Sequence, residues 1–368
     1  MSDAATPPFR ADHVGSLLRP AALHEARARA ARGEIDRAAL RAVEDQSIRE
    51  AVAFQESVGL RAITDGEFRR SWWHIDFLCG FDGVATTTGS FGVKFQGADE
   101  QPPLMQVTGK IRRARPNMLD HYTYLRPLTK RIAKFCIPSP AMLHARGDRA
   151  ALARVYPDLD QFWSDLTAAY RAEIGALRAA GCAYLQIDDT TVAMMCDPQV
   201  REQFRRLGDD PDRLSAIYAD AVNAALGDAR AGLTVTLHTC RGNFKSAWLA
   251  SGGYDPIAES AFNRLQVDGF FLEYDTERAG GFEPLRFMPK GKKVVLGLVS
   301  SKVPQLEDKD ELKRRIDAAA KYVALENLCL SPQCGFSSTH HGNKISLDDQ
   351  RRKLELVLEV AREVWGTA

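Results

Sequence analysis

Residues 233–243 read Leu-Thr-Val-Thr-Leu-His-Thr-Cys-Arg-Gly-Asn, a β-branched run that ends in polar residues. A short apolar run bounded in this way predicts a buried strand. Seven other segments share the pattern, and between them lie longer amphipathic stretches that predict helices. The eight predicted strands are 12–17, 61–67, 134–138, 183–188, 233–240, 269–274, 293–299 and 327–331. The main predicted helices are 34–58, 158–180, 210–231, 255–265, 308–324 and 347–364.

The number of strands decides between the architectures that 368 residues allow, which are one large α/β domain or two smaller ones. Eight strands alternating with helices predict a (β/α)8 TIM barrel that spans residues 1–368 as a single catalytic domain. In such a barrel the active site lies at the carboxyl ends of the strands. Polar residues at strand ends are therefore the first candidates for function.

The stretch 80–126 departs from this alternation, because turn-forming residues separate short runs such as 92–95 and 105–109. We interpret it as a β-hairpin inserted after the second strand. A connection of this length either covers the barrel mouth or contacts another subunit, and the sequence does not separate the two. A homo-oligomer therefore remains possible at this stage.

Charge and hydropathy exclude several classes of partner. Lys and Arg number 49 against 48 Asp and Glu, and the densest basic cluster is only Arg112, Arg113 and Arg115. This pattern predicts no nucleic-acid partner. No segment approaches the ~18 apolar residues that a membrane span requires, and the first residues do not resemble a secretion signal. We therefore expect a soluble, cytoplasmic protein.

The seven cysteines are an odd number in a chain expected to be cytosolic, which argues against a disulfide framework. They are then buried small residues or metal ligands. Five of them lie among apolar neighbours or lack polar company, and we expect these to be buried: Cys79, Cys136, Cys182, Cys196 and Cys329. The remaining two, Cys240 and Cys334, have polar neighbours that suggest metal chemistry.

His238 and Cys240 stand two residues apart at the end of a predicted strand, so their side chains share one face. An imidazole beside a thiolate suits zinc, which prefers mixed nitrogen and sulfur ligands. The pair alone is weak evidence, since a strand-end His and a buried Cys often meet by chance. Glu273 and Cys334 follow two later strands, where they are a solvated carboxylate and a packed loop residue in the simplest interpretation.

In a barrel, however, these strand ends surround one mouth, and four such residues together predict a zinc site. Three strong ligands with one weaker carboxylate leave a coordination position that a substrate can take. The sequence therefore predicts a catalytic metal site rather than a closed, structural one.

Six motifs in a fixed order give a specific likeness. From about residue 9 to residue 365 the chain resembles the cobalamin-independent methionine synthase family, in its C-terminal catalytic barrel. The resemblance rests on Asp12-His13-Val14-Gly15-Ser16, Ile63-Thr64-Asp65-Gly66-Glu67, Leu185-Gln186-Ile187-Asp188-Asp189, His238-Thr239-Cys240, Phe271-Leu272-Glu273 and Ser331-Pro332-Gln333-Cys334-Gly335.

The resemblance implies a zinc-dependent S-methyltransferase of methionine biosynthesis. It would transfer a methyl group from 5-methyltetrahydrofolate, or its polyglutamate, to the zinc-bound thiol of homocysteine. The implied ligands of zinc are His238, Cys240, Glu273 and Cys334. The resemblance further implies that Glu67 and Asp188 hold the substrate ammonium group and that Ser16 binds its carboxylate. In the simplest alternative these acids cap helices or pair with arginines.

Two departures from the family pattern leave the donor open. The loop 297–304 contains no His, whereas the family usually carries one there to protonate the leaving group. Weak substitutes are His74, His340 and His341, which are ordinary loop residues in the simpler interpretation. The additional N-terminal barrel of full-size members also has no counterpart in this chain. The alternatives are a zinc alkyltransferase with another donor and thiol, such as an epoxide and a sulfonate thiol, and a zinc hydrolase or lyase.

Overall fold

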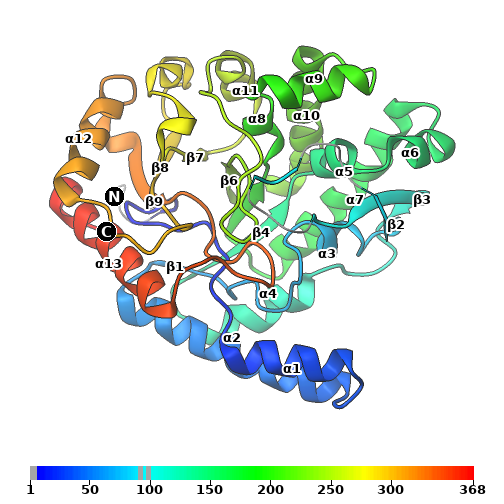
Figure 1. The fold of residues 1–368 in the computed structure, drawn as a ribbon, viewed down its shortest axis with the longest axis horizontal. Helices are drawn as coiled ribbons and strands as arrows, with labels where there is room; N and C mark the ends of the chain where they lie inside the picture. The colour runs from blue at the N-terminus through cyan, green and yellow to red at the C-terminus, as the bar shows by residue number, and fades with distance from the viewer. Residues whose placement is uncertain (1–5, 90–93, 97–100) are drawn as a thin grey trace.

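The computed structural model describes residues 6–89, 94–96 and 101–368. Seven parallel strands form one curled sheet, in the order β1-β4-β5-β6-β7-β8-β9, with helices on its outer face (Figure 1). The strands are β1 (Ala62–Ile63), β4 (Ile132–Pro138), β5 (Tyr184–Asp188), β6 (Thr234–Thr239), β7 (Gly269–Glu273), β8 (Lys293–Val299) and β9 (Leu328–Pro332). Seven of the eight predicted strands thus overlap an observed strand, and β1 is much shorter than predicted.

The segment 9–17 lies between β9 and β1, where the first strand was predicted. Ala11 forms an isolated parallel bridge with Leu330, and the Asp12 amide donates to the Leu330 carbonyl at 3.0 Å. Toward β1, the Leu17 amide donates to the Gly66 carbonyl at 3.1 Å. The curled sheet is therefore consistent with a TIM-like barrel in which the eighth position is irregular.

The prediction of a regular strand over residues 12–17 is wrong, and the side chain of Asp12 gives the reason. Its carboxylate accepts hydrogen bonds from the backbone amides of Phe9 and His13, which competes with strand pairing. It also binds the Tyr184 hydroxyl at 3.0 Å and the Lys134 ammonium at 3.1 Å. Side-chain hydrogen bonds of Asp12, and not regular backbone pairing between strands, therefore hold residues 9–17 against the barrel interior.

The predicted helices are present with shifted ends. α2 begins after Asp36, whose side chain caps the Ala39 amide, and ends at Gly59 with φ 104°. The predicted helix 210–231 is too long, since α10 ends at Leu226 and a 3-10 turn follows. The helices are α1 (Ala21–Ala31), α2 (Arg37–Val58), α3 (Ile75–Leu78), α4 (Leu119–Leu125), α5 (Ala141–Arg146), α6 (Arg149–Val155), α7 (Leu159–Ala179), α8 (Thr191–Met194), α9 (Pro198–Arg206), α10 (Pro211–Leu226), α11 (Ala258–Arg264), α12 (Lys309–Ala320) and α13 (Leu347–Trp365). No helix in the described ranges is long and apolar enough to cross a membrane.

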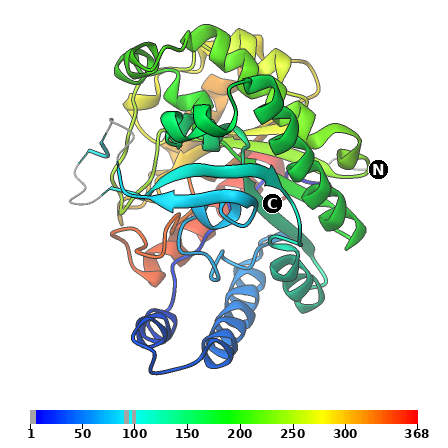
Figure 2. The same ribbon diagram turned by 90° about the vertical axis from the view of Figure 1, so that its right-hand side faces the viewer.

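Between β1 and β4 in the sequence, β2 (Asp82–Thr87) and β3 (Leu104–Arg112) pair as an antiparallel two-stranded sheet. Figure 2 shows these strands crossing the outside of the barrel. β3 is fastened to the helices beside it, because the Met105 carbonyl accepts from the Asp148 amide at 2.7 Å and the Ile111 amide donates to the Tyr156 hydroxyl at 2.7 Å. Part of the predicted run 92–95 lies outside the described residues.

Buried side chains fill the interior of the barrel. Val14, Phe271, Val295 and Cys329 form one buried cluster, and Phe9, Ala62 and Tyr184 form another. A parallel barrel is a packed core and not a pore, so a binding cavity is left only at the carboxyl ends of its strands.

Candidate active site

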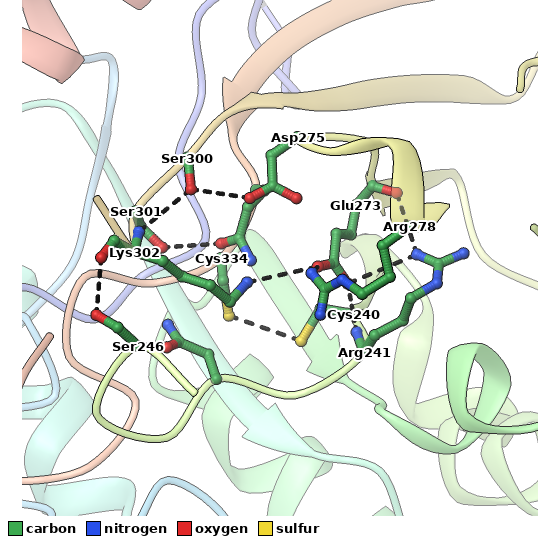
Figure 3. Close-up of polar contacts among 12 residues, drawn as sticks. Cys240, Arg241, Ser246, Glu273, Asp275, Arg278, Ser300, Ser301, Lys302 and Cys334 are labelled. Carbon is green, nitrogen blue, oxygen red and sulfur yellow. Dashed lines mark hydrogen bonds and ion pairs between the residues drawn. The ribbon is translucent and has the colours of Figure 1, made fainter. Parts of the chain in front are cut away.

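The ends of β6 and β9 bring three predicted metal ligands together. His238 lies near the end of β6, Cys240 directly follows that strand, and Cys334 lies in the turn after β9. Their ligand atoms all lie within 4.8 Å of one another, and the two Sγ atoms are 3.7 Å apart (Figure 3). All three side chains are buried, and neither ring nitrogen of His238 has a hydrogen-bond partner among the described residues. Buried polar atoms without partners are rare, and here they face two sulfur atoms.

The two thiols share their protons unequally. Contact with Cys240 lowers the pKa of the Cys334 thiol well below its ordinary value, and the same contact with Cys334 raises the pKa of Cys240. Cys334 is therefore the thiol of the pair that ionises more readily. A thiolate is the form of cysteine that binds a metal.

Glu273, at the end of β7, lies beside this group but faces three cations. Its carboxylate accepts from the Arg241 amide, from the Arg278 guanidinium at 2.7 Å, and from the Lys302 ammonium at 3.4 Å (Figure 3). Burial opposes ionisation, yet Lys302, Arg241 and Arg278 lower the pKa of Glu273 to about 2. Glu273 is ionised at neutral pH, and its oxygens are not among the three-membered group of ligand atoms.

The two predicted ammonium-binding acids lie together. Glu67, Asp188 and Cys136 form a second buried group with ligand atoms within 4.8 Å of one another. Burial raises the pKa of Glu67 to about 7, and the charge of Asp188 adds to the shift. Arg70, whose Nη1 lies 3.6 Å from Glu67 Oε2, opposes it. Burial likewise raises the pKa of Asp188 to about 6, against the influence of His238. A cation placed between the two carboxylates would favour their ionised forms.

Ser16 reaches the same place from the segment 9–17. Its hydroxyl accepts from the Ser337 amide at 3.4 Å, and the Phe336 amide donates to its carbonyl at 3.0 Å. A β-carbon added at Gly335 would lie 1.9 Å from Ser16 Oγ, so a larger residue there would displace Ser16 or the Cys334 turn.

One cavity joins these groups. Its walls include Ser16, Glu67, Asp188 and the three metal-type residues, so the structure places six of the seven predicted ligand and substrate residues around it. Part of the cavity wall is aromatic: Trp72 stacks on Phe244 with ring centres 5.5 Å apart, and the ring centre of Phe95 lies 5.5 Å from that of Phe244. A lining that mixes aromatic side chains with a few convergent polar groups is typical of small-molecule sites.

The three histidines named as weak proton donors differ in position. His74 lines the cavity and is buried, and burial together with Arg146 holds its pKa well below 6.5. His340 and His341 stack on each other at 3.8 Å and stand edge-on to Trp72. His341 Nδ1 shares a hydrogen bond with the Thr339 hydroxyl at 3.0 Å. Only His74 of the three belongs to the cavity wall.

Sequence reasoning missed the cations around the site. Arg146 lines the cavity at the end of α5, and Arg241, Arg278 and Lys302 surround Glu273. Arg241 directly follows Cys240, and Lys302 lies in the loop after β8, where the strand-end rule would have pointed to both. No comparable signal marks Arg146 or Arg278.

The model for the catalytic domain of cobalamin-independent synthases matches residues 9–362. The fold and this match define a methyltransferase with a TIM-like barrel. The chain belongs to the cobalamin-independent methionine synthase family.

Relatives by sequence include the uncharacterized protein YxjH of Bacillus subtilis, 46% identical over 97% of this chain and 95% of that protein. A 5-methyltetrahydropteroyltriglutamate–homocysteine methyltransferase of Thermosynechococcus vestitus is 24% identical over 91% of this chain, which corresponds to 41% of that enzyme.

Two solved structures resemble the whole chain. A putative vitamin-B12 independent methionine synthase from Listeria monocytogenes has a TM-score of 0.77 and 38% identity, with 98% of each chain covered. A B12-independent methionine synthase from Shewanella sp. W3-18-1, in complex with selenomethionine, has a TM-score of 0.72 and 17% identity over 96% of this chain and 97% of that one. The second likeness concerns the fold alone.

Proposed function

We propose that the protein is a zinc-dependent methyltransferase that makes methionine from homocysteine, with 5-methyltetrahydrofolate or its polyglutamate as the donor. The observation that carries this proposal is one cavity that contains both the His238, Cys240 and Cys334 group and the Glu67–Asp188 pair. A thiol that also bears an ammonium group matches both parts of that cavity.

The donor set fits zinc. Zinc prefers sulfur and imidazole ligands in a tetrahedral site. This group offers two sulfur atoms and the imidazole of His238, whose ring nitrogens have no hydrogen-bond partner among the described residues. We propose Glu273 as the fourth, weaker ligand. The contact with Cys334 and burial raise the pKa of Cys240, and the charge of Glu273 adds to this shift, as expected of a near neighbour. Bound zinc would lower the pKa of the substrate thiol, which is otherwise mostly protonated at pH 7.

Recognition of the amino acid part falls to residues at the ends of other strands. We propose that Glu67 and Asp188 bind the ammonium group and that the Ser16 hydroxyl binds the carboxylate. The two carboxylates are already within 4.8 Å of each other, and Ser16 approaches the cavity beside Gly335. The substrate is thereby oriented with its sulfur toward Cys240 and Cys334.

Methyl transfer then requires few further groups. The substrate thiol releases its proton to solvent, and its sulfur attacks the methyl carbon in line with the bond that breaks. A carbon–sulfur bond forms, the carbon–nitrogen bond breaks, and the nitrogen keeps the electron pair and takes a proton from water. Holding the two reactants in line supplies much of the rate acceleration, since a bimolecular step becomes effectively unimolecular within one complex.

We propose that the chain is one catalytic barrel and that the stretch 80–126 serves as its cover. Phe95 and Pro102, both from this stretch, line the cavity. The β2–β3 sheet beside them is tied to α5–α7 through Met105 and Tyr156. A cover of this kind keeps water away from the reacting atoms.

The experiment uses zinc-loaded protein and two thiols, homocysteine and 4-mercaptobutanoate, which lacks the amino group. We expect homocysteine to add a sulfur ligand in the zinc K-edge spectrum at a concentration at least about 10-fold lower than 4-mercaptobutanoate. Glu67→Gln and Asp188→Asn should remove this preference while zinc remains bound. With 5-methyltetrahydrofolate present, mass spectrometry should detect methionine. Equal responses to both thiols, or a response to neither, would refute homocysteine as the substrate.

A further inference from the structure

Arg19 is a buried arginine whose side chain bonds to two different connections at the mouth of the barrel, and it is only 6% exposed. Its Nη2 donates to the carbonyl oxygens of Glu67 at 2.8 Å and Arg70 at 2.7 Å, in the turn after β1. Its Nη1 donates to the Ser337 hydroxyl at 2.7 Å and to the carbonyl oxygens of Ser337 at 3.2 Å and Thr339 at 3.1 Å, in the loop after β9. One guanidinium therefore joins two loops that lie far apart in the sequence.

Each of these connections carries one end of the proposed substrate site. Glu67, in the turn after β1, is one of the two acids proposed to bind the ammonium group. Cys334, in the turn after β9, is a proposed ligand of the metal that holds the thiol. Its Sγ lies 3.7 Å from the hydroxyl of Ser338, which stands between the two residues that Arg19 binds in this loop. Arg19 thus links the ammonium end of the site to its thiol end.

The backbone of Glu67 depends on its neighbours for support. Its φ of 60° is left-handed, which is uncommon for a residue other than glycine and persists only where surrounding contacts hold it. The Asp65 side chain accepts from the Glu67 amide at 2.9 Å, and Arg19 donates to the Glu67 carbonyl. Bonds on both sides of Glu67 therefore fix the place of its side chain in the cavity wall.

Arginine is well suited to hold two loops at a fixed separation. Its guanidinium is planar and rigid, and it presents its donors in a fixed fork. The five hydrogen bonds of Arg19 go to carbonyl and hydroxyl oxygens of the two loops. Lysine has one ammonium group on a flexible chain, so it would not hold both loops in the same geometry.

We propose that Arg19 is a positioning residue that determines which length of thiol amino acid the site accepts. This inference rests on the proposed function, because it needs the ammonium group at Glu67 and the sulfur at the metal. Homocysteine has one methylene group more than cysteine between the carbon that bears the amino group and the sulfur. When the two ends of the site are held apart by a rigid group, homocysteine reaches both ends, whereas cysteine reaches only one of them at a time.

The test measures the affinities of homocysteine and free cysteine for zinc-loaded protein by isothermal titration calorimetry, with the zinc content checked before and after. We expect the native protein to bind homocysteine about 10-fold to 200-fold more tightly than cysteine, as a difference of one methylene group allows. Arg19→Met should weaken homocysteine more than cysteine and so reduce this preference at least about 5-fold. Arg19→Lys should reduce the preference less, because lysine can keep part of the contacts.

Arg27 provides a matched control, because it binds the turn after β1 and, among the described residues, makes no hydrogen bond to the loop after β9. Its guanidinium donates to the Phe68 carbonyl at 2.5 Å and to the Ser71 hydroxyl at 3.1 Å. Arg27→Met should lower the free energy of unfolding in urea but leave the preference for homocysteine unchanged. A preference that depends on Arg19 and not on Arg27 cannot come from a general loss of stability.

The inference is overturned if folded Arg19→Met keeps the native preference, if Arg27→Met reduces the preference as much as Arg19→Met does, or if the native protein binds the two thiols equally. If Arg19→Met does not fold, Arg19→Lys takes its place: a reduced preference supports the inference, and an unchanged one overturns it. A native protein that binds neither thiol contradicts the proposed function, whereas tight homocysteine binding with the same preference in every Arg19 variant contradicts this inference alone.

Discussion

The Sγ atoms of Cys240 and Cys334 lie 3.7 Å apart, although 94 positions separate the two cysteines in the sequence. The strand order explains why they meet, because β6 and β9 are parallel strands of the same curled sheet and their carboxyl ends lie on the same side of it. His238 completes the group from the same strand end as Cys240.

The thiol pair predicts the metal content of variants. Native protein should contain about one zinc per chain, and Cys240→Ser and Cys334→Ser should each lose most of it, because a hydroxyl is a far poorer zinc ligand than a thiolate. Elemental analysis after dialysis measures this. Cys79→Ser is the matched control, since Cys79 lies outside the group and is only partly buried. Full zinc occupancy in both ligand variants would refute the assignment.

The three cations around Glu273 predict a pH-dependent contribution to stability. Its pKa falls from 4.5 to about 2 on folding, so its ionised form stabilises the fold above about pH 4.5, and this contribution is lost as the pH falls toward 2. Glu273→Gln should therefore cost roughly 3 kcal/mol near neutral pH and less in acid. Urea unfolding of metal-free protein at several pH values measures the difference. The exposed control Glu355→Gln should stay within about 0.5 kcal/mol; a constant Glu273 effect across pH would contradict the ionic interpretation.

The raised pKa of Glu67 predicts how substrate affinity depends on pH. Glu67 titrates near pH 7 in the free site, and only its ionised form attracts an ammonium group. The KM for homocysteine should therefore fall as the pH rises from about 6 to about 8. In Glu67→Gln the KM should be at least about 10-fold higher and this dependence should flatten. Steady-state kinetics provides the measurement, with exposed Glu50→Gln as control; an unchanged pH profile in Glu67→Gln would exclude Glu67 as the titrating group.

The close approach of Gly335 to Ser16 predicts a steric effect. Gly335→Ala would press its methyl group against Ser16 Oγ at 1.9 Å, which should displace the Cys334 turn and weaken both zinc and homocysteine. Adding Ser16→Gly should restore zinc binding but not homocysteine affinity. Gly175→Ala, in α7 with open space around it, should be neutral or stabilising by about 0.5 to 1 kcal/mol. Zinc titration and urea unfolding test the set, and normal zinc affinity in Gly335→Ala would show that the turn adapts.

The sequence predicted the regular part of the barrel because buried parallel strands are continuous apolar runs. β8 has the predicted bounds, and β4 to β9 all lie where they were expected. The strand predicted over 61–67 continues too far, because β1 ends at Ile63 and the chain then turns: the Asp65 side chain accepts from the Glu67 amide, and Glu67 has a φ of 60°. A left-handed residue other than glycine carries no signal in a single sequence.

For the site, the strand-end rule found the metal-type residues because they are few and chemically distinctive. It could not find Arg146 or Arg278, since arginine is common and only the folded chain shows which of them are buried. The strand-end rule points to Arg241 and Lys302, but it could not predict that they and Arg278 meet on one carboxylate, because the three cations come from separate connections after β6, β7 and β8.

The packing of residues 9–17 against β9 has a consequence for the order of events in biosynthesis. A ribosome releases His238 and Cys240 long before Cys334, and the Ser16 carbonyl must wait about 320 residues for the Phe336 amide that binds it. The complete thiol pair therefore does not exist on a nascent chain that stops before β9 and the turn that follows it. A metal that needs both thiols would therefore bind only after β9 and the turn that follows it have been translated, when residues 9–17 can pack against β9.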